Sequence, residues 1–152
     1  MLQHTIKQVI NAPLDRVYEG IADLRRYGEI HPYMVEVKQI DGEDANATYY
    51  RVKEDFLLYG FIPMKPVYDA KILEQEKQKH VQYVSDVMPG VHLTIDFRFV
   101  CDEGTGCTEI TETILLDAPV LIRTVFMGIL KRAHNLFYKK LKDLLQPTLN
   151  NQ

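Results

Sequence analysis

Two carboxylates occupy sequence positions where apolar side chains are expected. Glu112 has an isoleucine two residues away on either side, and Glu54 has a valine and a phenylalanine at the same spacing. Because alternate residues of a strand share a face, both carboxylates are predicted to lie on an apolar face. Burial raises the pKa of a carboxyl group, so that it can donate or accept a proton near neutral pH. Glu112 and Glu54 are therefore the candidate catalytic residues.

Several polar residues follow the same pattern. Those with the parity of apolar neighbours are Tyr50, Tyr68, Tyr83 and Ser85. A phenol supplies a ring that packs against a ligand and a hydroxyl that orients it, and small-molecule pockets are mostly apolar with a few polar groups. In the other interpretation the tyrosines fill the core. The two carboxylates then reach water near strand ends or bulges, or pair with an internal basic group.

The histidines and cysteines show no metal-binding or nucleophile motif. The five histidines are scattered, and none stands near another His, Cys or acid at a zinc-ligand spacing. Cys101 and Cys107 match neither a zinc nor a redox motif, and strand parity predicts opposite faces for them, which argues against a disulfide. We expect no metal and no cofactor. His31, which precedes Pro32, is interpreted as a residue of the pocket mouth or as a surface cap.

The elements that position these residues follow from hydrophobic periodicity. A strand is predicted at 2–10, a helix from 14 to about 24, and a second short helix at 25–31. Period-two alternation then predicts six antiparallel strands, at 34–40, 47–59, around 68–72, 81–87, 91–101 and 108–116. From 120 to 146 the period becomes 3.6, which predicts a closing helix of roughly 40 Å. Its predicted apolar stripe comprises Ile122, Phe126, Ile129, Ala133, Leu136, Phe137, Leu141 and Leu144.

Similar sequences precede the first and the last predicted helix. Asn11 begins an Asn-Ala-Pro sequence and Asp117 an Asp-Ala-Pro sequence. Asparagine and aspartate side chains can cap a helix, and proline is tolerated in its first turn. Pro147 is predicted to end the last helix, because proline cannot continue one.

Composition and charge describe an ordinary soluble domain. The chain has 152 residues, 46% apolar and 26% charged, which predicts one domain over 1–152. A net charge of −3 provides no positive field for nucleic acid. The sequence shows no targeting segment and no apolar run of membrane-spanning length, so a cytoplasmic protein is predicted. From residue 131 onward five basic residues and one acidic residue give +4, which favours either transient contact with an anionic membrane or a solvated helix face.

The order of elements resembles a known superfamily. The sequences that carry the resemblance are Asn-Ala-Pro-Leu-Asp-Arg-Val-Tyr at 11–18, Ala-Asp-Leu at 22–24 and His-Pro-Tyr at 31–33. They are similar to START-like, or SRPBCC, proteins, in particular the polyketide cyclase/dehydrase and coenzyme-Q-binding-like branch. The resemblance implies an α+β helix-grip fold, in which a curved antiparallel sheet of about seven strands wraps around the C-terminal helix. Members include carriers, receptors, cyclases and co-chaperones, so the fold assigns no single function.

The resemblance implies a cavity for a hydrophobic small molecule between sheet and helix. The expected ligand is a lipid, a quinone or a polyketide-like ring system, and binding or carriage is favoured over catalysis. One alternative is a cyclase or dehydratase that uses the same pocket, and another is a co-chaperone-like module that binds a protein partner. Both monomer and dimer remain open. The predicted ligand-binding residues are Tyr50, Phe56, Tyr68, Tyr83, Phe97, Glu112, Phe126, Met127, Leu130 and Phe137.

Overall fold

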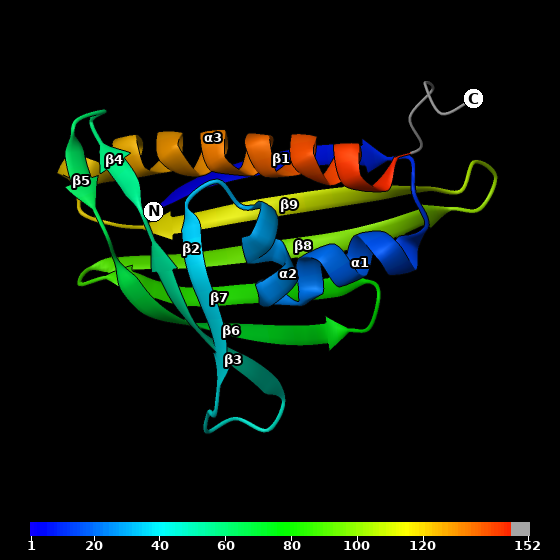
Figure 1. Ribbon diagram of the computed structural model, residues 1–152, viewed down its shortest axis with the longest axis horizontal. Helices are drawn as coiled ribbons and strands as arrows, with labels where there is room; N and C mark the ends of the chain where they lie inside the picture. The colour runs from blue at the N-terminus through cyan, green and yellow to red at the C-terminus, as the bar shows by residue number, and fades with distance from the viewer. Residues whose placement is uncertain (147–152) are drawn as a thin grey trace.

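A computed structural model describes residues 1–146 (Figure 1). Its elements confirm the predicted α+β helix-grip fold, with two short helices after the first strand and a long helix at the end. In chain order they are β1 (Leu2–Ile10), α1 (Leu14–Ala22), α2 (Leu24–Ile30), β2 (Met34–Ile40), β3 (Ala47–Glu54), β4 (Phe56–Leu58), β5 (Ile62–Met64), β6 (Val67–Glu76), β7 (His80–Met88), β8 (Val91–Asp102), β9 (Cys107–Asp117) and α3 (Val120–Leu145).

Seven strands form one antiparallel sheet in the order β1-β9-β8-β7-β6-β3-β2. In Figure 1, α3 runs lengthwise along β1 and β9, and α1 and α2 lie beside its C-terminal half. Period-two alternation explains the best-defined pair, since alternate residues of β8 are buried. The register of β8 and β9 places Phe99 opposite Ile110 and Phe97 opposite Glu112, so the apolar faces match as predicted.

The strand predicted at 47–59 is interrupted at Asp55. The Asp55 N–H donates to the carbonyl of Tyr33 at 2.8 Å, which takes the chain out of the ladder that β3 forms with β2 and β6. The remainder becomes β4, which pairs only with β5 in a separate two-stranded sheet. Its turn includes Tyr59 and Gly60, both at positive φ, one residue earlier than the reversal predicted at 60–63. The result is a small hairpin beside the main sheet.

The predicted capping by Asn11 and Asp117 is wrong. Pro13 and Pro119 are the N-cap residues of α1 and α3, and neither helix has a side-chain cap. The carbonyls of these prolines accept the first helical hydrogen bonds, so the Asn and Asp side chains stand two residues too early to reach the helix N–H groups. The end of α3 is at Leu145, one residue before the predicted end, and Pro147 lies outside the described residues.

The predicted stripe of α3 is correct in part. Leu136 and Leu144 are 40% and 63% exposed. The buried residues are Phe126, Met127, Ala133, His134, Phe137, Tyr138 and Leu141. The buried face of the helix is thus rotated from the predicted one. His134 and Tyr138 point into the interior, whereas Leu136 and Leu144 do not. None of the helices within residues 1–146 has both the length and the apolar character needed to cross a membrane.

Candidate functional site

A cavity of about 60 Å³ lies between the sheet and α3. Its wall is mostly apolar and is built from α2, the strands β2 to β4 and β6 to β9, and α3. Such a cavity has room for only a few water molecules. Ligand pockets usually measure about 300–1,000 Å³. In this conformation the cavity is therefore too small for a ring system.

The structure places some predicted ligand-binding residues in the cavity wall and others behind it. Those that line the cavity are Phe56, Tyr68, Tyr83, Phe126 and Leu130, together with the candidate acid Glu54. Those that do not are Tyr50, Phe97, Glu112, Met127 and Phe137, all of which are buried.

The ring of Tyr27 explains why the cavity occupies only part of the space between sheet and helix. Tyr27 projects from α2, stacks on Phe137 with ring centroids 4.1 Å apart, and meets Phe97 edge-on at 6.4 Å. These three rings fill the interior beside α2 with direct contacts. Tyr27 lies on a short helix, to which the alternation pattern of strands does not apply. The strand patterns therefore could not reveal that its ring fills this part of the interior.

The hydroxyls of the tyrosines in the wall have different partners. Tyr83 donates to the carbonyl of Ile21, and Tyr68 donates to Glu54 Oε2 at 2.6 Å. The Tyr27 hydroxyl is buried and has no hydrogen-bond partner among residues 1–146. A buried hydroxyl without a partner is unfavourable, so Tyr27 places an unsatisfied polar group in the interior.

Glu54 is the carboxylate that lines the cavity directly. It is the last residue of β3, where the chain leaves the main sheet. Removal from water raises its pKa, an effect that the Tyr68 hydroxyl and nearby His134 partly oppose. A carboxyl group in this environment holds a proton more readily than one in water, so Glu54 is suited to donate a proton to a ligand.

Glu112 forms a buried network with two residues of α3. Its Oε2 accepts a hydrogen bond from Tyr138 at 2.6 Å, and its Oε1 lies in direct contact with His134 Nδ1. His134 and Tyr138 are four residues apart, so they lie on one face of the helix and meet the carboxylate together. The arrangement agrees with the interpretation in which Glu112 pairs with an internal basic group.

His134 connects this network to the cavity. The His134 side chain lines the cavity, and Glu112 occupies its Nδ1, so Nε2 is the ring nitrogen left for a ligand. Strand parity and the predicted stripe of the last helix did not indicate this histidine. A usable signal was present, because His134 lies one helical turn from Leu130 and from Phe137.

His31 is a second histidine in the wall. Its Nδ1 accepts a hydrogen bond from the Tyr33 N–H at 3.1 Å, and its ring lies 6.0 Å from that of His134. Burial lowers the pKa of His31 to about 3, and the nearby side chains of His134 and Lys140 lower it further. His31 is therefore neutral near pH 7 and carries its proton on Nε2. It lines the cavity and is 7% exposed.

The polar groups of the wall suit proton transfer and ligand orientation. They are a histidine held by a carboxylate, a neutral histidine and a carboxyl group with a raised pKa. In the part of the chain that the structure describes, no three His, Cys, Asp or Glu side chains gather as metal ligands would.

A seven-stranded antiparallel sheet around a long C-terminal helix, with a cavity between them, defines a protein of the helix-grip fold. The sequence profile of one family, described as "Polyketide cyclase / dehydrase and lipid transport", matches residues 1–146. The chain belongs to this family. None of the curated proteins matches the chain in sequence.

Solved structures share this fold at low sequence identity. The Zhui aromatase/cyclase from Streptomyces sp. R1128 is 16% identical, with a TM-score of 0.71 and 93% of each chain covered. A protein from Thermus thermophilus is 14% identical, with a TM-score of 0.72 over 93% of this chain and 95% of that one. A START superfamily protein from Mycobacterium smegmatis is 9% identical, with a TM-score of 0.69 over 93% and 98%. The TM-scores establish a common fold, and at such low identities the similarity extends no further.

Proposed function

We propose that this protein binds a hydrophobic small molecule between the sheet and α3 and carries or presents it. The observation that carries the proposal is the apolar cavity with Glu54, His31 and His134 in its wall. Apolar walls favour the transfer of a hydrophobic molecule from water, and a few polar groups set its orientation. Family membership supports the same class of function.

Binding requires the cavity to widen, and the β4–β5 hairpin is suited to this movement. A groove of about 810 Å³ between the hairpin and α3 shares the side chains of Tyr33, Phe56 and Ile129 with the cavity wall. The Phe56 ring lies between those of Tyr33, at 5.9 Å, and Phe126, at 6.1 Å. Because β4 pairs only with β5, Phe56 can move outward without breaking the seven-stranded ladder. Such a movement would join groove and cavity.

A cavity-filling substitution tests the binding function. Ala70→Leu adds a branched side chain to the cavity wall, and we expect it to weaken binding of the neutral dye N-phenyl-1-naphthylamine by about tenfold or more, a loss of roughly 1.4 kcal/mol. Fluorescence titration measures the dissociation constant. Gln82→Leu, on the outer face of β7, is the matched control and should bind as the wild type does. Absence of dye binding by the wild type, or an equal loss in both variants, would contradict the proposal.

A second candidate function is proton-transfer catalysis of the cyclase or dehydratase type. The observation that favours it is the His134–Glu112 pair beside the cavity, with Glu54 in the same wall. His134 Nε2 would take a proton from a carbon next to a carbonyl group, while protonated Glu54 would donate its proton to the carbonyl oxygen, leaving an enol. Glu112 would stabilise the imidazolium that forms. Aldol-type ring closure and dehydration both proceed through such an enol.

Deuterium exchange into a model ketone tests this second function. With 2-tetralone in D₂O, we expect the wild type to accelerate hydrogen–deuterium exchange at the carbon next to the carbonyl. Proton NMR measures this exchange as the loss of the proton signal. His134→Gln should reduce the acceleration about 100-fold, since positioned bases typically contribute 10²- to 10⁴-fold. The control is His80→Gln, because His80 pairs with Asp96 outside the cavity wall. An exchange rate equal to that of buffer alone would remove catalysis of this kind and leave the binding function intact.

A further inference from the structure

Large apolar side chains are exposed together on two short segments. One segment is the β4–β5 hairpin, and the other is the first turn of α3. Phe61 is 74% exposed and Leu121 is 87% exposed. The Tyr59 hydroxyl donates to the carbonyl of Leu121 at 3.5 Å, so the two segments are adjacent, as Figure 1 also shows. The hairpin face is defined here as Leu57, Tyr59, Phe61, Ile62, Val120 and Leu121.

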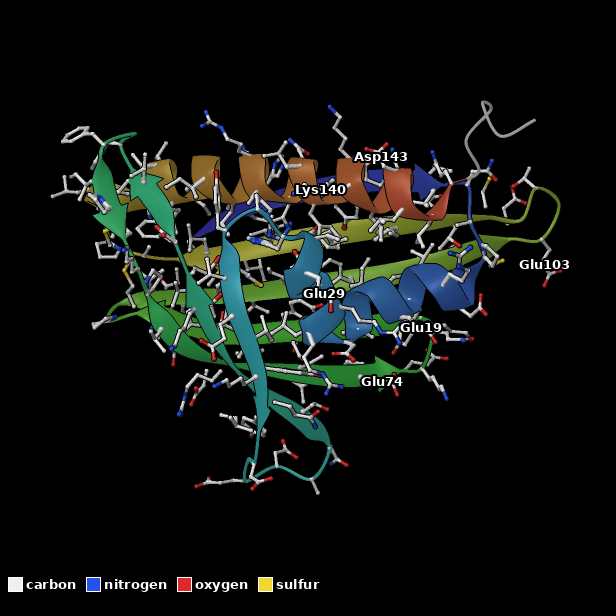
Figure 2. All side chains as sticks on the ribbon, viewed as in Figure 1. Glu19, Glu29, Glu74, Glu103, Lys140 and Asp143 are labelled. Atoms are coloured by element: carbon white, nitrogen blue, oxygen red, sulfur yellow. The ribbon has the colours of Figure 1, made fainter. Side chains whose placement is uncertain are left out.

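Cations outnumber carboxylates around this face. The chain has 21 acidic residues, yet residues 56–68 and 118–142 contain none. Lys65 and Arg123 lie in these segments, and Arg132 lines the groove beside the hairpin together with one carboxylate, Asp55. Figure 2 shows Glu19 and Glu103 toward the opposite end of the molecule. The hairpin face thus combines exposed apolar side chains with cations in a protein of net negative charge.

We propose that the hairpin face docks onto an anionic lipid bilayer. Exposed aromatic and aliphatic side chains enter the interfacial region of a bilayer, and adjacent cations are attracted to anionic headgroups. The apolar side chains of this face lie on a turn and a helix start, elements that can insert at shallow depth. A contact through the basic end of α3, where Lys140 lies, remains a separate prediction, because that end is distant from the hairpin (Figure 2).

The hairpin face lies beside the groove that leads toward the cavity. The hairpin forms one side of the groove whose wall includes Phe56. Gly128 lies on the other side and faces open space, because a Cβ added there would contact nothing within 4 Å. A hydrophobic molecule that leaves the bilayer at this place could enter past Phe56 without crossing water. This route depends on the proposed binding function, whereas docking itself does not.

Tryptophan fluorescence can test the docking, because the chain contains no tryptophan. We expect the emission of Phe61→Trp to shift to shorter wavelength with phosphatidylcholine vesicles that contain phosphatidylglycerol, and to be quenched by brominated lipid. Val100→Trp is the matched control, because Val100 is 63% exposed on β8 and lies outside the hairpin face. It should show neither effect.

Sedimentation with the same vesicles tests the contribution of the face. Phe61→Ser with Leu121→Ser should reduce the vesicle-binding constant at least about tenfold, because two large apolar side chains no longer leave water. Val9→Ser with Val100→Ser, which removes two comparably exposed residues elsewhere, should leave binding unchanged. Lys65→Gln with Arg123→Gln should weaken binding only to the anionic vesicles.

Three outcomes would overturn the docking proposal. They are no vesicle binding by the wild type, equal loss in both serine pairs, and a concentration-dependent dimer in analytical ultracentrifugation that Phe61→Ser abolishes. The last outcome would identify the face as an interface between two copies of the chain. Dye binding in the cavity is measured without vesicles, so failure of docking and failure of the proposed binding function are distinguishable.

Discussion

Glu112→Ala is expected to lower the free energy of unfolding by about 3–5 kcal/mol, the range typical of removing one partner from a buried pair of titratable groups. Glu112 is 0% exposed, and both of its carboxylate oxygens are engaged, one by Tyr138 and one by His134. Truncation leaves the Tyr138 hydroxyl and His134 Nδ1 in the interior without an acceptor. Urea denaturation followed by circular dichroism measures the change.

Matched variants distinguish the stability that the Glu112 network contributes from the effect of removing any carboxylate from β9. Glu109→Ala removes an exposed carboxylate from the same strand and should change stability by less than about 0.5 kcal/mol. Tyr138→Phe should cost about 1 kcal/mol, the usual net contribution of one hydrogen bond. Glu112→Leu combined with His134→Leu should recover much of the loss, because both members of the pair become apolar. A Glu112→Ala cost no greater than that of Glu109→Ala would show that the network does not stabilise the fold.

Acidification is expected to destabilise the fold through His31 by about 3 kcal/mol at pH 4. The pKa of buried His31 is about 3, compared with an ordinary value of 6.5. Its contribution to stability is complete above pH 6.5 and is lost as the pH falls toward 3, because the unfolded chain binds a proton that the folded chain does not. Between pH 6.5 and pH 4, about 2.5 pH units at 1.36 kcal/mol per unit account for the magnitude.

The contribution of His31 can be isolated with His31→Gln. Glutamine retains an acceptor for the Tyr33 N–H but does not titrate. The stability difference between wild type and variant should therefore change by about 3 kcal/mol between pH 7 and pH 4 in urea denaturation. The raised pKa of Glu54 acts in the opposite direction, but it is present in both proteins and cancels in the difference. A difference that is constant with pH would show that His31 takes up a proton as readily in the folded protein as in the unfolded chain.

The regular elements were predictable because their signal is local. Alternation along β8 and β9 set both the strands and the matching of their apolar faces, since strand parity depends only on backbone geometry. The break at Asp55 was not predictable, because it depends on a hydrogen bond to the carbonyl of Tyr33, which comes from another part of the chain. Capping failed for a local reason, since each proline occupies the cap position itself.

The candidate site also has features that the sequence predicted and features that it did not. Parity correctly indicated that Glu112 is buried, but its partners come from α3, more than twenty residues further along the chain. The rotation of α3 about its own axis decides that His134 and Tyr138 face inward while Leu136 is exposed. That rotation is set by packing against β1, β9 and the two short helices, which no pattern within the helix itself contains.

Local periodicity was enough to predict the strands, the long helix and the carboxylate on the inner face of β9. Contacts between distant elements bring His134 to this carboxylate, let Tyr27 fill one part of the interior and leave the cavity in the other. The physical reason is that periodicity records which side of an element leaves water. It does not record which side chains, arriving from distant elements, share the space that remains.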